Sequence, residues 1–226
     1  SLLVSDGRVG GALGVQLCDG TPVVITAQAV IIACGGGACL FERTDNPPGT
    51  TGDGIALAYH AGAELVDLEL VSFQFPTRRI AEAFAAPGVP AEALLSTGAA
   101  HYFLGGIAID DRCHTGLAGL FAAGETTGGL FGAARLGGAA VAEVLVFGAL
   151  AGREAAAHAA VTEACGPDEA QVREGRARVA ALLTGEGPTA EEVTARLRAL
   201  MWRYCGAIKS RGALETGLRE LEQLEG

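Results

Sequence analysis

The sequence predicts an α/β protein in which a parallel sheet and a β-meander precede a small C-terminal helical domain. Three observations favour it. Short apolar runs separated by Asp-Gly turns open the chain, an unbroken apolar run at residues 29–33 ends in three glycines, and a charged helical tail begins near residue 168. A length of 226 residues suits one domain with a small appendage. We place the domains at residues 1–160 and 161–226.

The first thirty residues predict the meander. Apolar runs at residues 2–4, 15–17 and 23–25 are separated by Asp6-Gly7 and Asp19-Gly20. Short strands joined by Asp-Gly dipeptides are typical of hairpins. The next run, residues 29–33, has no polar residue, which is the pattern of a parallel strand buried on both faces.

The middle of the chain alternates between helices and short strands. A helix is predicted over residues 55–61 and ends at Gly62, a residue suited to the left-handed position after a helix. Strands are predicted over residues 66–75, 101–109 and 119–125, and residues 77–100 form an irregular connection. A glycine-rich loop over residues 128–138 leads into a long apolar helix over residues 139–159.

The tail predicts a helical hairpin or three helices. Thr189 and Glu192 have the spacing of a capping box, in which each side chain bonds the backbone N–H of the other residue. Apolar residues recur at helical spacing after this start and again near the C-terminus; they are Val193, Leu197, Leu200, Met201, Tyr204, Leu214, Leu218 and Leu221.

Composition excludes several classes of protein. Half the residues are hydrophobic and 19% are charged, so the chain is not intrinsically disordered. A net charge of −10 without a basic run argues against nucleic-acid binding. We expect the apolar stretch at residues 139–150 to be too short for a bilayer span, and no signal peptide is visible. The six cysteines and four histidines show no metal-ligand spacing, which favours a reduced cytoplasmic protein with no metal site.

The 34 glycines indicate close backbone approach to a ligand or between elements. Common nucleotide motifs do not explain them. A relaxed G-x-G-x-x-A match at residues 185–190 follows a helix and contains Pro188, which lacks an N–H for a phosphate. No Walker sequence and no G-x-S-x-G nucleophile motif is present.

Several segments in order carry a resemblance instead. They are Ala33-Cys34-Gly35-Gly36, Asn46-Pro47, Thr51-Gly52-Asp53-Gly54, Ala61-Gly62-Ala63, residues 69–77 (ELVSFQFPT), His101-Tyr102 with Gly105-Gly106, Gly124-Glu125, and residues 132–138 (GAARLGG). This series resembles the flavoprotein family of succinate dehydrogenase, fumarate reductase and L-aspartate oxidase. The resemblance covers nearly the whole chain. It implies that residues 1–160 are a partial FAD-binding, Rossmann-like domain.

The resemblance implies a set of FAD-binding residues: Gly35, Gly36, Asp53, Glu125, Ala140 and Val141. Glu125 would accept hydrogen bonds from FAD hydroxyl groups, as a carboxylate at a strand end does in dinucleotide folds. Ala140 and Val141 would contribute backbone groups at a helix N-terminus, which favours the negative charge of a reduced flavin.

The resemblance also implies a substrate site for a C4 dicarboxylate, which is fumarate or succinate, or else aspartate. His101 and Arg135 match the family's dicarboxylate-binding positions, and the guanidinium of arginine suits a carboxylate because it binds both oxygens. Gln74 stands where the family has a substrate-contacting histidine. The implied reaction is hydride transfer between flavin and substrate, for which the cofactor supplies the chemistry.

The chain departs from the family pattern in four respects. It begins after the point where the family places its G-x-G-x-x-G loop. Residues 78–100 replace a much longer capping domain, so they form a vestigial cap. Gln74 lacks the charge of a histidine, and the family's asparagine and serine positions are Ala134, Ala139 and Ala140.

Two classes of function therefore stay open. The first is an oxidoreductase of the fumarate reductase and succinate dehydrogenase type, with L-aspartate oxidase as the alternative within the family. The second is a non-catalytic remnant, or one half of a split flavoprotein that needs a complementing N-terminal chain. The family also implies an iron–sulfur partner, and any membrane contact would come through other subunits.

Overall fold

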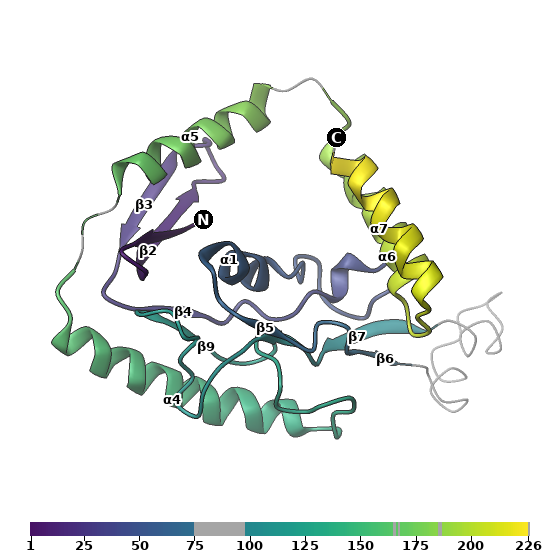
Figure 1. Ribbon diagram of the computed structural model, residues 1–226, viewed down its shortest axis with the longest axis horizontal. Helices are drawn as coiled ribbons and strands as arrows, with labels where there is room; N and C mark the ends of the chain where they lie inside the picture. The colour runs from purple at the N-terminus through teal and green to yellow at the C-terminus, as the bar shows by residue number, and fades with distance from the viewer. Residues whose placement is uncertain (75–97, 165, 167, 185–186, 226) are drawn as a thin grey trace. The chain divides into compact units, whose positions relative to one another are not determined.

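A computed structural model describes residues 1–74, 98–164, 166, 168–184 and 187–225. The chain forms two compact units, each built from separate segments (Figure 1). The first contains residues 1–36, 52–68 and 104–187, and the second contains residues 37–51, 69–103 and 188–226. These units cut across the expected division at residue 160, which stays a prediction about domains. The expected vestigial cap lies almost wholly outside the described residues.

The predicted meander is present in the first unit. Strands β1 (Leu2–Ser5), β2 (Arg8–Val15) and β3 (Pro22–Thr26) form an antiparallel sheet in that order. Helix α5 (Glu169–Thr184) packs against this sheet, and its Val172 is buried with Leu3 and Leu13. The first helix of the tail therefore belongs with the meander, because its apolar positions match the sheet face.

A parallel strand pair forms the centre of the first unit. Strand β4 (Val30–Ile32) pairs in parallel with β9 (Leu120–Ala122), and helices α1 (Asp53–Ala61) and α4 (Ala139–Val161) lie on opposite sides of the pair (Figure 1). This confirms the predicted α/β class. Strand β9 is wholly buried, but Ile31 of β4 is 42% exposed. The expectation that residues 29–33 are buried on both faces is therefore wrong at Ile31.

Helix α1 ends as predicted, with Gly62 in the left-handed conformation at φ 96°. Helix α4 is longer than predicted and extends over 23 residues, because Glu143 is buried inside it and does not interrupt it. By length and composition α4 could cross a bilayer, so the expectation that this stretch is too short is wrong. A core helix of a soluble protein meets the same test, and the finding goes no further.

The predicted strand at residues 66–75 is divided between the units. In the first unit β5 (Leu65–Val66) pairs with β8 (Gly106–Ile107). In the second, β6 (Val71–Gln74) pairs with β7 (Ala99–Phe103). Asp67 ends β5 because its φ of 57° lies in the left-handed region, which a strand does not allow.

The second unit combines this strand pair with a helical hairpin. Its other elements are a 3-10 turn, η1 (Ala38–Leu40), and helices α6 (Ala190–Cys205) and α7 (Arg211–Glu225). The ring of Phe73 meets those of Phe41 and Trp202, with centroids 5.4 and 6.1 Å away. Tyr204 donates a hydrogen bond of 2.6 Å to Glu220 between the two helices. The predicted capping box at Thr189 and Glu192 is confirmed.

Candidate functional site

The carboxyl ends of β4 and β9 form the first part of the candidate site. In α/β sheets these ends are where ligands bind. Gly35, after β4, has a φ of 78°, and Gly124, after β9, has a φ of 79°. Both values favour glycine. The carboxylate of Glu125 occupies the space that a side chain at Gly36 would need. The absence of a side chain at Gly36 therefore lets Glu125 stand directly against the backbone.

The start of α1 is joined to the same edge. The backbone N–H of Gly52 donates to the carbonyl of Gly36 at 3.0 Å. A side chain at Gly54 would come within 3.0 Å of Cys34, so the first turn of α1 lies against the end of β4. Asp53, the first helical residue, is exposed beside that contact. The structure thus brings Gly35, Gly36, Asp53 and Glu125 to one edge of the parallel strand pair.

This edge fits the cofactor that the sequence implies. The space at Gly36 is a cradle in which backbone and carboxylate meet, and Gly35 has no neighbour where a side chain would stand. The hydroxyl oxygen of Thr126, next to Glu125, is buried without a hydrogen-bond partner in the described structure. Exposed backbone, a carboxylate and an unused hydroxyl are groups that bind a ligand rich in hydroxyl and amide groups.

The start of α4 adds a weaker contribution than the sequence implies. The capping residue Gly138 has a φ of 83° and provides no side-chain cap. The N–H of Val141, however, already donates to the carbonyl of Gly138 at 3.1 Å. Ala140 is half-buried in the same first turn. A side chain at Gly124 would lie 3.4 Å from Val144, so this end of α4 approaches the edge that holds Glu125.

The three residues expected to bind the substrate divide between the units. Arg135 lies in the loop before α4, in the first unit, and is half-buried. Gln74 and His101 come from the paired strands β6 and β7 of the second unit. Gln74 is exposed at the end of β6, opposite Ala99.

Sequence reasoning missed one residue of this second group. The Nδ1 atom of His101 lies 2.8 Å from Oδ2 of Asp45, which precedes the Asn46-Pro47 motif. The two residues are 56 positions apart, so no local pattern could have paired them. The adjacent motif was the one available signal, because it marks the loop that carries Asp45.

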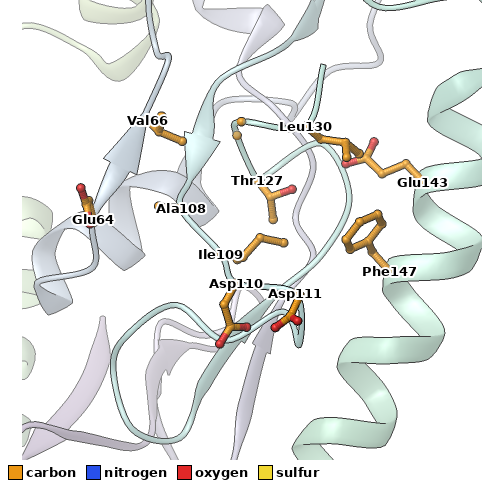
Figure 2. A pocket seen from close by; sticks show the side chains of 12 residues that line it. Glu64, Val66, Ala108, Ile109, Asp110, Asp111, Thr127, Leu130, Glu143 and Phe147 are labelled. Atoms are coloured by element: carbon orange, nitrogen blue, oxygen red, sulfur yellow. The ribbon is translucent and has the colours of Figure 1, made fainter. Parts of the chain in front are cut away.

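A cavity of about 380 Å³ lies elsewhere in the first unit, and Figure 2 shows its acidic lining. Glu64, Asp110, Asp111 and Glu143 line it, and none of the residues expected to bind cofactor or substrate does. Burial works to raise the pKa of Asp110. The N–H groups of His114 and Arg112 outweigh this, so the pKa lies below its ordinary value. A charged acidic cavity does not suit a dicarboxylate.

Among the described residues, no group of three or more histidine, cysteine, aspartate and glutamate side chains could hold a metal ion.

Comparison with known proteins gives a family. The family described as "FAD binding domain" matches residues 1–91 and 82–141. The fumarate reductase (CoM/CoB) subunit of Methanothermobacter marburgensis is 28% identical over 308 residues, which cover 99% of this chain and 56% of that protein. L-aspartate oxidase 2 of Ralstonia nicotianae is 27% identical over 306 residues, covering 99% of this chain and 55% of that protein.

Solved structures agree. Sdh1 of Mycobacterium smegmatis, in complex with UQ1, has a TM-score of 0.82 and 25% identity, and the match covers 99% of this chain and 52% of Sdh1. The FrdA protein of E. coli quinol fumarate reductase has a TM-score of 0.80 at 24% identity, which shows the shared fold. The chain therefore spans about half the length of the relatives it matches.

Proposed function

The chain belongs to the FAD binding domain family, and we propose that it acts as part of an FAD-dependent oxidoreductase of the fumarate reductase and succinate dehydrogenase type. The proposed reaction is hydride transfer between the flavin and a C4 dicarboxylate. FAD, when bound, accepts or supplies the hydride. The residues of this chain bind and orient the two partners.

The edge formed by β4 and β9 is the observation that carries this proposal. Gly36 and Glu125 meet there, and the start of α1 is bonded to the same backbone. In this arrangement Glu125 accepts hydrogen bonds from FAD hydroxyl groups, and Gly35 and Gly36 let the cofactor approach the main chain. Asp53 contributes a second carboxylate near the cofactor.

Arg135 and His101 are the proposed ligands of the dicarboxylate. Arg135 binds one carboxylate through two parallel hydrogen bonds, and His101 donates to the other. Gln74 adds an uncharged hydrogen bond. Because Gln74 carries no charge, it orients a carboxylate more than it attracts one.

Flavin spectroscopy tests the proposal in two steps. FAD added to the purified chain should shift the flavin absorption bands, and a colourless chain with no shift would refute FAD binding. With FAD chemically reduced, fumarate should reoxidise it. Arg135→Ala should slow this reoxidation about 100-fold or more while FAD stays bound, because two charge-assisted hydrogen bonds are lost. Loss of FAD itself would instead assign Arg135 to the cofactor.

L-aspartate oxidase activity is the second candidate, favoured by the relative from Ralstonia nicotianae. The same preparation decides between them. Reduction of bound FAD by L-aspartate but not by succinate would select the oxidase. Reoxidation by fumarate together with reduction by succinate would select the fumarate reductase type.

Partner chains are part of the proposal because the chain spans about half the length of its relatives. An iron–sulfur subunit would exchange electrons with the flavin, and a complementing N-terminal chain would supply the G-x-G-x-x-G loop. Copurification of a tagged chain with either partner supports this arrangement. FAD binding and turnover by the isolated chain would show that neither is required.

A further inference from the structure

A short loop holds strand β7 at His101. The backbone of Ala100 donates to the carbonyl of Arg43 at 2.9 Å, and the hydroxyl of Thr44 donates to the carbonyl of Ala100 at 2.8 Å. The side-chain amide of Asn46 donates to the carbonyl of His101 at 2.7 Å. The loop at residues 43–46 is thus bonded to the backbone on both sides of the His101 nitrogen.

His101 lies at an irregularity in the strand pairing. Phe73 pairs with Ala100 and Ser72 pairs with Tyr102, which leaves His101 as the extra residue of a bulge. A bulge turns one side chain out of the regular alternation and is common beside functional sites. Ala100 and Tyr102 are buried, whereas the His101 side chain is 27% exposed.

Asp45 is fixed against the ring of His101. Its Oδ2 lies 2.8 Å from Nδ1, and its Oδ1 accepts a hydrogen bond of 3.0 Å from the Asn46 amide. An ionised carboxylate can only accept, so the proton between them belongs to Nδ1 of the histidine. The bond made by one ring nitrogen decides which state the other can adopt.

This has a consequence for ligand binding. With the proton held at Nδ1, Nε2 of His101 donates only when the ring is an imidazolium. A substrate carboxylate needs a donor, and the charge of Asp45 balances the imidazolium that provides it. An Asp45–His101 pair therefore offers a carboxylate one oriented donor.

Resting on the proposed function, in which His101 binds a substrate carboxylate, we infer that Asp45 is a positioning residue for His101. It holds Nδ1 as the donor to its own carboxylate and directs Nε2 to the substrate. Asn46 supports both partners, because it bonds the Asp45 carboxylate and the His101 carbonyl.

The ring nitrogen chemical shifts of His101 test this without cofactor or substrate. In the ¹⁵N-labelled chain, with His101 assigned from a His101→Gln variant, the neutral ring should carry its proton on Nδ1. Asp45→Ala should move the population toward the Nε2-protonated form. Asp45→Asn, which keeps an acceptor oxygen, should retain the Nδ1 proton in part. A wild-type ring protonated on Nε2, or shifts unchanged in Asp45→Ala, would overturn the inference.

Turnover separates this inference from the proposed function. With FAD bound, Asp45→Ala should raise KM for fumarate about 10- to 100-fold while FAD affinity is unchanged, the range seen when the residue orienting a ligating histidine is removed. The control is Glu169→Gln, which removes an exposed ion pair with Arg173 on α5. A KM change no larger than the control's would overturn the positioning role. No turnover in the wild type would instead overturn the proposed function, and the nitrogen shifts still decide the Asp45–His101 bond.

Discussion

The Glu125 carboxylate lies in the position that a side chain on Gly36 would occupy. These two residues follow β4 and β9, the paired parallel strands, and are 89 positions apart in the chain. Their contact makes the carboxyl edge of the strand pair a place where backbone and carboxylate reach one ligand together. A carboxylate there is suited to ribose or ribityl hydroxyl groups.

Gly36→Ala should weaken FAD binding much more than it destabilises the fold. The atoms nearest to the new methyl group all belong to the side chain of Glu125, which can rotate away, and the backbone need not move. Displacing the carboxylate removes a charge-assisted hydrogen bond, which corresponds to about a 10- to 100-fold rise in Kd. Fluorescence quenching of FAD measures the Kd.

Gly14→Ala is the matched control, because no atom lies within 4 Å of a side chain placed at Gly14. Its Kd and thermal midpoint should stay close to the wild-type values. Equal FAD affinity in both variants would contradict a role for the Gly36–Glu125 contact.

FAD should protect Cys34 from alkylation. Cys34 is exposed at the end of β4, one residue before Gly35, so a cofactor bound at this edge covers its thiol. Cys18 is exposed in the turn between β2 and β3 and should react at the same rate with and without FAD. Burial raises the pKa of the Cys113 thiol, which should stay unmodified.

Mass spectrometry of iodoacetamide-treated protein measures each site separately. Protection of Cys34 and Cys18 to the same degree would indicate global stabilisation and not a cofactor at the β4 edge.

The parallel strand pair and the helix caps could be predicted because local patterns determine them. An unbroken apolar run indicates a parallel strand, and Gly62 and Thr189 have the residue types that helix ends require. The division of residues 66–75 between β5 and β6 could not be predicted. It follows from the left-handed backbone of Asp67, whose carbonyl lies where a side chain at Gly105 would stand.

The site was predictable from sequence only where motifs carry it. The cofactor residues around Gly36 and Glu125 follow short motifs at strand ends. The bond between Asp45 and His101 joins a loop to a bulge 56 positions away, and tertiary structure alone creates it. Ile31 likewise has the type of a core residue but is 42% exposed, since burial depends on which elements cover a strand.

Gly106→Ala should destabilise the first unit severely. A side chain at Gly106 would collide with the backbone carbonyl of Thr126, which cannot rotate away as a side chain does. The N–H of Ile107 also donates to that carbonyl at 2.9 Å, so the collision disrupts the pairing of β8. We expect a loss of about 1–3 kcal/mol or more in the free energy of unfolding, from urea denaturation. Gly137→Ala, with open space at that position, should lose far less.

Thr189→Ala should shorten α6 at its start and lower the free energy of unfolding by about 1 kcal/mol. The Thr189 hydroxyl accepts from the backbone of Glu192 at 3.2 Å, and the Glu192 carboxylate accepts from the backbone of Thr189 at 2.8 Å. Thr216→Ala is the control. Its hydroxyl bonds the carbonyl of Gly212 within α7 and caps no helix, so the substitution should be close to neutral.

The capping box also sets a pH dependence. Hydrogen bonds from the backbone and hydroxyl of Thr189 hold the pKa of Glu192 below its ordinary value. A group whose pKa is lower in the folded state stabilises the fold above its unfolded pKa, about 4.3, and this contribution is lost as pH falls through the folded pKa. The difference in thermal midpoint between wild type and Thr189→Ala should therefore be constant from about pH 6 to 8 and shrink below about pH 4. A difference that does not change across this range would show that the carboxylate takes no part in the cap.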